Sequence, residues 1–309
     1  MKRMFISLAL ALALLHCSAP GTKDLNTEFK TLNNDELEKV TEALPESPSV
    51  IPAGKRRLLV FSLAWGYKHE SGPWGKPVFD LMGQKTGAFE AVVTDDPAEF
   101  EPQKIKQYDA ILFNNTNNEI FMPEFPDSLD DEALEKALAY DATLKKSLQD
   151  YLMNGGGLAV LHAGLASFRQ WPEFGNIIGA RFDNHPWQFA VLKKDDPEHP
   201  LVAAFADASI AVTDEIYQFK EPYSRDNLRV LLSIDTKNTD MTLNGINRTD
   251  GDFALSWIKE YGKGRVFYNA FGHQKAIFWN PEVLQHWLDG IQFVLGDLDC
   301  DITSIPKTL

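Results

Sequence analysis

Short apolar runs of strand length alternate with segments of helical periodicity from about residue 58 onward. The first four runs cover residues 58–63, 91–94, 109–114 and 157–162. The segments between them repeat their apolar residues at helical spacing, as residues 144–152 do. Strands that alternate with helices are joined by right-handed crossovers. The order therefore predicts an α/β fold with a doubly wound, mostly parallel sheet flanked by helices.

The second half of the chain has a more mixed pattern. Further strands are predicted around residues 189–192, 229–234, 254–257 and 265–270. The last helix is predicted over 282–295, because its apolar residues recur at the spacing of one helix face. The acidic stretch 126–135 is typical of a helix start, where carboxylates are favoured by the helix dipole.

The first 54 residues differ in character from the rest of the chain. A basic start is followed by an apolar stretch that is too short for a membrane span, which indicates an export signal over residues 1–17. The signal ends at Cys17 in a sequence close to a bacterial lipobox, although His16 departs from the usual small residue. We expect a lipid anchor at Cys17 in preference to simple secretion, and a protein facing the periplasm or the cell exterior. Residues 18–54 are polar and contain three prolines, so we interpret them as a tether with one short helix at 34–43.

Composition and charge exclude several classes of protein. The formal net charge of −14 argues against nucleic-acid binding, which needs a basic surface. The chain contains no P-loop and no GxGxxG turn. Its only cysteines are Cys17 and Cys300, so lipidation of the first leaves no disulfide. The pattern thus predicts one α/β domain over 55–298 with a short tail at 299–309, and it carries no signal for an oligomeric state.

Histidines follow three of the predicted strands. His69 comes after the first strand, His162 ends the fourth, and His273 follows the strand at 265–270. The carboxyl ends of parallel strands share one edge of a sheet, where ligands of α/β proteins collect. We therefore expect the three imidazoles to face one pocket. A histidine satisfied by backbone hydrogen bonds at a turn is the alternative for each of them taken alone.

Five spaced motifs resemble the ThuA-like (trehalose utilisation) family. They are Trp65-Gly66-Tyr67-Lys68-His69-Glu70, Gly155-Gly156-Gly157 through His162-Ala163, Phe182-Asp183-Asn184-His185-Pro186, Asp214-Glu215-Ile216-Tyr217, and Tyr261-Gly262-Lys263-Gly264-Arg265-Val266 through Gly272-His273. The resemblance covers about residues 58–296 and implies a flavodoxin-like fold of the class I glutamine amidotransferase type. It does not imply glutaminase chemistry, because His162 lies in the region where those enzymes carry their nucleophilic cysteine. Ser167 lacks the GxSxG turn of a serine hydrolase.

The resemblance also implies a site for a small-molecule carbohydrate. We expect His162 and Glu215 to be catalytic, with Glu215 as the base if burial raises its pKa. His69, His185 and His273 are expected to bind substrate or a divalent metal such as zinc, which imidazole and carboxylate ligands suit. Asp214 is expected to be structural. Further substrate contacts are expected from Trp65, Tyr67, Asn115, Asn184 and Tyr217.

Three functions compete at this point. The first is an exported enzyme that removes a proton beside the carbonyl of a keto-sugar or keto-glycoside, leading to isomerisation, epimerisation or elimination. The second is a carbohydrate-binding lipoprotein without turnover, which needs aromatic platforms but no cluster of histidine and glutamate. The third is a metal-dependent hydrolase of an unrelated amide or ester. We expect about two of six loop aromatics to line a cleft, namely Trp65, Tyr67, Trp74, Trp171, Trp187 and Trp279.

Overall fold

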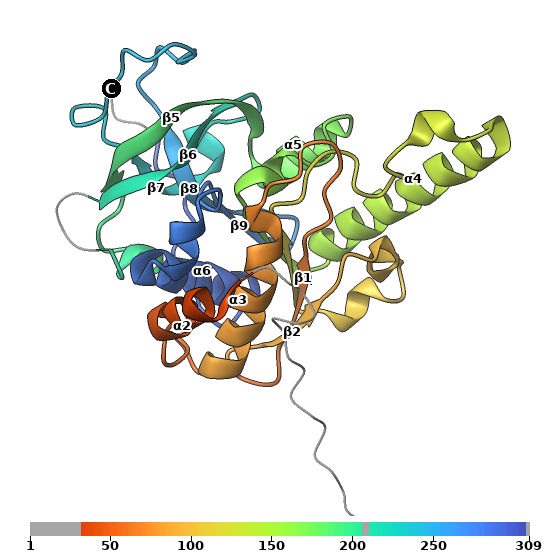
Figure 1. Ribbon diagram of the computed structural model, residues 1–309, viewed down its shortest axis with the longest axis horizontal. Coiled ribbons are helices and arrows are strands. Elements are labelled where there is room, and N and C mark those ends of the chain that lie inside the picture. Colours follow the sequence, from red (N-terminus) through yellow and green to blue (C-terminus); the bar gives the residue numbers. More distant parts are fainter. Residues whose placement is uncertain (1–31, 206–209, 307–309) are drawn as a thin grey trace, which may run out of the picture.

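The computed structural model describes residues 32–205 and 210–306. Nine strands within these ranges form one sheet in the order β2-β1-β3-β4-β9-β8-β7-β5-β6 (Figure 1). One half of the sheet is parallel and consists of β1 (Arg57–Phe61), β2 (Glu90–Val93), β3 (Ala110–Asn114), β4 (Gly157–Leu161) and β9 (Gly264–Asn269). The other half is antiparallel and adds β5 (Arg181–Lys194), β6 (Ile210–Lys220), β7 (Arg229–Ile234) and β8 (Ala254–Tyr261).

Helices cover both faces of the parallel half. One layer contains α3 (Ser71–Thr86) and α6 (Pro281–Val294), with the rings of Phe79 and Trp287 in contact at 5.6 Å. The other layer contains α4 (Asp131–Met153) and α5 (Pro172–Ile178), which lie on the opposite side in Figure 1. The strands between the layers are buried on both faces, and β3 and β4 have no exposed residue. Two-sided burial explains their uninterrupted apolar sequence.

The α/β fold predicted from the sequence is confirmed. Each predicted strand and the last helix are present, with bounds shifted by a few residues at most or extended outward. The acidic stretch and the helical segment at 144–152 form one helix, α4, capped by the Asp130 side chain. Four elements were not predicted: α3, which contains Pro77 and three glycines, the short helix α5, the strand β6, and the first half of β5.

The described part of the predicted tether is packed on the domain. The short helix α2 (Asn34–Ala43) has the predicted bounds and a capping box between Asn33 and Glu36. Leu32, Val40 and Leu44 are buried in the main core. Residues 32–54 thus belong to the domain, because burial of their apolar side chains offsets the entropy lost on ordering them. This corrects the predicted tether, which extended to residue 54.

The expected signal segment, Cys17 and residues 18–31 lie outside the described residues. Among the residues that the structure describes, none of the helices has the length and apolar character needed to cross a membrane.

Candidate active site

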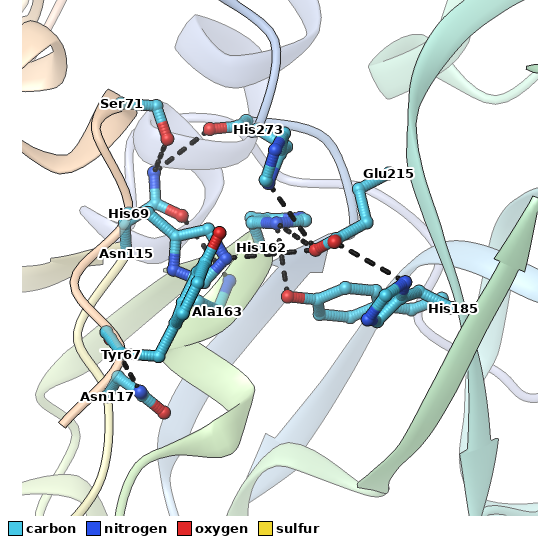
Figure 2. Close-up of polar contacts among 12 residues, drawn as sticks. Tyr67, His69, Ser71, Asn115, Asn117, His162, Ala163, His185, Glu215 and His273 are labelled. Carbon is cyan, nitrogen blue, oxygen red and sulfur yellow. Dashed lines mark hydrogen bonds and ion pairs between the residues drawn. The ribbon is translucent and has the colours of Figure 1, made fainter. Parts of the chain in front are cut away.

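Loops at the carboxyl ends of three parallel strands bring the predicted histidines together. His69 lies between β1 and α3, His162 follows β4 directly, and His273 follows β9. The ring centroids of His69 lie 5.0 Å from His162 and 5.3 Å from His273. Figure 2 shows the three rings facing one another around a common point. The predicted convergence at one edge of the sheet is therefore observed.

His162 occupies a strained turn at the end of β4. Its φ of 45° lies in the left-handed region, which residues other than glycine rarely adopt. The chain then turns at once into a short 3-10 helix, η4 (His162–Ala166). Gly164 permits this turn, because a Cβ there would lie 3.0 Å from the Phe113 carbonyl oxygen. The sharp turn directs the imidazole of His162 from the sheet edge toward the other two histidines.

Asp214 fixes the loop that carries His273. Its carboxylate accepts hydrogen bonds from the backbone N–H groups of Gly272 at 2.7 Å, His273 at 3.1 Å and Gln274 at 2.7 Å. Gly272 has φ 139°, which favours glycine at this position. Asp214 is fully buried and is structural, as predicted.

Glu215 lies at the centre of the histidine cluster. Its Oε2 is 3.3 Å from His162 Nε2, 3.4 Å from His273 Nδ1 and 3.7 Å from His69 Nε2. Its Oε1 faces His185 Nδ1 at 3.4 Å. Glu215 comes from β6, at the far edge of the antiparallel half, so both halves of the sheet contribute to the site.

The hydrogen bonds of His162 define its protonation. Its Nδ1 lies 2.7 Å from the Ala270 carbonyl oxygen, which can only accept, so Nδ1 carries a proton. Its Nε2 accepts from the Tyr217 hydroxyl at 3.0 Å, because burial keeps the pKa of Tyr217 well above its usual value. The same Nε2 lies 3.3 Å from Oε2 of Glu215, and its one lone pair either accepts from Tyr217 or binds a cation beside Glu215. An unprotonated Nε2 and a carboxylate oxygen at this distance repel each other unless a proton or a metal ion lies between them.

This donor set fits a divalent metal ion. His69, His162, Glu215 and His273 each offer one ligand atom, and the four atoms lie within 4.8 Å of one another. An imidazole that donates its other N–H to a backbone carbonyl, as His162 does, is the usual arrangement of a metal-bound histidine. Three nitrogens and one carboxylate oxygen suit zinc or a similar transition metal.

A cleft opens above the cluster. Its volume is about 290 Å³, and Glu215, His69 and Tyr217 reach its floor. Tyr67, 65% exposed, and His185, whose side chain is 46% exposed, stand on its rim. The remaining lining residues are Asn117, Ala163, Ala166, Arg169 and Phe182. The size of the cleft is close to that of small-ligand sites, and His162 is buried beneath it.

The profile of the ThuA family, described as trehalose utilisation, matches residues 57–294. The chain belongs to the ThuA family. Membership connects it with carbohydrate metabolism and with a small sugar as its ligand. None of the curated proteins searched matches the chain.

Solved structures of low sequence identity share the ThuA fold. A ThuA-like protein of Bacteroides uniformis has 20% identity and a TM-score of 0.58, with 80% of this chain and 94% of that chain covered. A ThuA-like protein of Parabacteroides merdae has 17% identity and a TM-score of 0.52, with coverages of 78% and 90%. A cytoplasmic protein of Salmonella typhimurium has 14% identity and a TM-score of 0.50, with coverages of 77% and 98%. At these identities the likeness concerns the fold.

The cluster differs from the predicted metal set, which consists of His69, His185 and His273. The structure adds His162 and Glu215 to the cluster and leaves His185 on the rim of the cleft. His162 follows a strand end directly, whereas His185 lies within β5, whose first half was not predicted as a strand. His162 was also predicted to contact the substrate as a catalytic residue. Its side chain is fully buried, so it does not reach the cleft surface.

Three predicted substrate contacts have other roles in this ThuA protein. The Trp65 indole donates to the Met122 carbonyl at 2.9 Å and does not line the cleft. Asn115 is buried and donates to the Gly272 carbonyl at 3.1 Å, so it supports the His273 loop. Asn184 donates to the Gly245 carbonyl at 2.7 Å, also outside the cleft.

The expected role of Glu215 as a base depends on burial raising its pKa. Burial alone would raise its pKa, but the interactions with His162, His273 and His69 outweigh burial and hold the pKa of Glu215 well below its usual range. The lowered pKa favours the carboxylate as a ligand or ion-pair partner over a role as a base. The same anion raises the pKa of His273, whereas burial lowers the pKa of His69.

Sequence reasoning missed Asn117, Arg169 and Phe182. Asn117 belongs to the polar run after β3, and its amide donates to the Tyr67 carbonyl at 2.8 Å. It thereby holds the segment that carries Tyr67 and His69. Arg169 follows η4 and has no sequence signal of its own. Cys300, far along the chain, is partly buried, which raises the pKa of its thiol to about 11.

Proposed function

We propose that this protein is a carbohydrate enzyme that holds a divalent metal and removes a proton beside the carbonyl of a keto-sugar or keto-glycoside. The observation that carries the proposal is the convergence of three imidazole nitrogens on Oε2 of Glu215 at the floor of a cleft. The metal ligands would be His69, His162, Glu215 and His273.

The donor set supports the metal assignment through charge. When unprotonated, the three imidazoles would present lone pairs to the Glu215 carboxylate at a common point, and a cation there would remove their mutual repulsion. The metal, when bound, supplies a Lewis acid that polarises a sugar carbonyl oxygen. Glu215 and the imidazoles would hold it, and Asp214 keeps His273 in place through the backbone of its loop.

His185 is the best placed group to move the proton. It lines the cleft, and its Nδ1 lies 3.4 Å from Oε1 of Glu215, which orients the ring. Its Nε2 has no partner among the described residues. The free imidazole can take a proton from the carbon beside the carbonyl and return it to the same or the adjacent carbon. If a glycosidic oxygen lies β to the carbonyl, its departure completes an elimination instead.

The shape of the cleft favours an enzyme over a binding module. Of the six loop aromatics expected as sugar platforms, Tyr67 alone lines the cleft. Trp187 is fully buried, and its indole donates to the Asp240 carbonyl at 2.8 Å. Phe182 and Tyr217 also line the cleft, so aromatic faces suited to either function are present. The cluster of histidines and glutamate is the feature that a catalyst needs and a binding module does not.

The test is exchange of the carbon-bound proton with solvent deuterium. The zinc-loaded protein is incubated in D₂O with a 3-keto-glucoside, and exchange beside the carbonyl is followed by NMR. We expect His185→Ala to slow exchange by about 10²–10⁴-fold, the usual contribution of a general base. His199→Ala is the matched control, since His199 lies outside the cleft against the Asp301 carbonyl.

Two results would contradict the proposal in different ways. Wild-type protein that binds the sugar and never exchanges its proton is a binding module. The metal site is refuted if proton exchange continues after complete chelation of the metal. It is also refuted if zinc still binds after the combined changes His69→Ala and Glu215→Gln.

We also propose that the protein is exported and anchored through a lipid on Cys17. The proposal rests on the basic start, the apolar stretch and the lipobox-like sequence around Cys17.

A further inference from the structure

A second pocket adjoins the cleft. It has a volume of about 230 Å³ and shares Ala166, Arg169 and Phe182 with the cleft. Its other walls come from η4, from α5 and from the paired ends of β5 and β6. The cleft and this pocket therefore lie side by side and meet at Phe182 and Arg169.

Three cationic side chains line the second pocket: Arg169, Arg181 and Lys220. Arg181 and Lys220 are opposite each other on neighbouring strands, an arrangement that destabilises a sheet when both charges have the same sign. Within residues 32–205 and 210–306, no carboxylate forms an ion pair with any of the three. The chain has 44 acidic and 30 basic residues, so acidic partners are not scarce.

One acidic residue, Asp183, also lines the pocket. Its carboxylate accepts a hydrogen bond from the Asn247 side chain at 2.8 Å. The Arg169 guanidinium donates to the Ala166 carbonyl at 3.3 Å and the Asn117 side chain at 3.5 Å, which places it between pocket and cleft. The pocket thus has an excess of positive charge within a strongly acidic protein.

We propose that this pocket binds an anionic group, a carboxylate or a phosphate, on the part of the sugar substrate that lies away from the reacting carbon. The inference rests on the proposed function of the neighbouring cleft. A neutral sugar ring binds through hydrogen bonds and an aromatic face. It carries no charge that would offset the repulsion between Arg181 and Lys220. An anion between them removes their repulsion, and guanidinium groups match the oxygens of both carboxylate and phosphate.

The test compares three ligands of similar size in their binding to the protein as purified. Calorimetry measures the affinities of glucose, glucuronate and glucose 6-phosphate, and the stronger of the two anions distinguishes a carboxylate site from a phosphate site. We expect at least one anion to bind about tenfold or more tightly than glucose, with an advantage that shrinks as salt screens the charges.

Variants assign that advantage to the pocket. Arg181→Gln with Lys220→Gln should reduce it to about threefold or less, as expected when charge-assisted bonds are lost. Arg181→Lys should retain most of it. Lys136→Gln is the control, because Lys136 is an exposed cation on α4 paired with Glu132. If the Arg181 variants fail to fold, Lys220→Gln alone serves, since Lys220 is exposed.

The inference is overturned if both anions bind no more tightly than glucose. It is also overturned if the double variant keeps the full preference for the anion over glucose, as expected when the anion binds the metal instead of the pocket. Neither result bears on proton exchange in the cleft. Conversely, the protein could bind anions preferentially and yet show no proton exchange. That result would support the anion pocket and refute only the proposed reaction.

Discussion

Asp214→Asn tests whether one buried carboxylate holds the His273 loop in place. The wild-type carboxylate accepts three backbone hydrogen bonds, two of them at 2.7 Å. The amide keeps one acceptor oxygen and turns an NH₂ group toward a backbone N–H, leaving a buried donor without a partner. Hydrogen bonds to a charged group contribute about 1.5–3 kcal/mol, and an orphaned donor costs about 1–3 kcal/mol. We expect a total loss of about 2–4 kcal/mol in the free energy of unfolding.

Urea unfolding measures the first part of this prediction. With a slope near 3 kcal/mol per molar urea, the loss corresponds to a midpoint lowered by about 1 M. Asp240→Asn is the control, because the exposed Asp240 carboxylate also accepts a backbone hydrogen bond, from Thr242 N–H at 2.8 Å. It should move the midpoint by less than about 0.3 M, as surface substitutions usually do.

Zinc affinity measures the second part. His273 belongs to the same loop, so Asp214→Asn should weaken zinc binding by about 10–100-fold, the usual effect of losing a residue that supports a metal ligand. An unchanged urea midpoint would refute the three-bond anchor. A lowered midpoint with unchanged zinc affinity would show that the anchor does not position His273.

Two further predictions concern other parts of the chain. Cys17→Ser should move the protein from the membrane to the soluble extracytoplasmic fraction, and membrane association that survives the change would exclude the lipid anchor. Burial raises the pKa of Asp289 to about 6, against hydrogen bonds from Ser49 and Gln285. The folded state therefore keeps this proton at pH values where the unfolded state has lost it, and the free energy of unfolding falls by about 3 kcal/mol between pH 4 and pH 6. Asp289→Asn should remove that fall. Urea unfolding should therefore show that the variant is more stable than wild type at pH 7.5 and about equally stable at pH 4.5. Equal differences at both pH values would contradict the raised pKa of Asp289.

The sequence predicted the parallel half of the fold well for a physical reason. Strands buried on both faces are continuous apolar runs, and glycine turns mark their starts, as Gly155 does before β4. Because the polar residues just past such strands meet at one edge, the convergence of His69, His162 and His273 was predictable without coordinates.

The antiparallel half was less predictable. β6 mixes exposed and buried positions and carries Asp214, Glu215 and Tyr217 inward, so its polar residues obscure the strand pattern. β5 contains three irregularities in its pairing with β6 and a proline, Pro186. Long-range register of this kind depends on packing between distant segments, which local periodicity does not encode.

Glu215 lies on β6, which pairs within the sheet only with β5, whereas the histidines that surround it follow β1, β4 and β9. An ion held by all four groups therefore ties the last strand of the antiparallel half to the loops of the parallel half. Asp214 on the same strand already ties β6 to the loop after β9 through backbone hydrogen bonds, so loss of the ion would remove one of two ties and leave the other. Backbone amides of β6 should accordingly exchange with solvent faster without the ion than with it, while the hydrogen bonds of Asp214 keep the strand in the sheet.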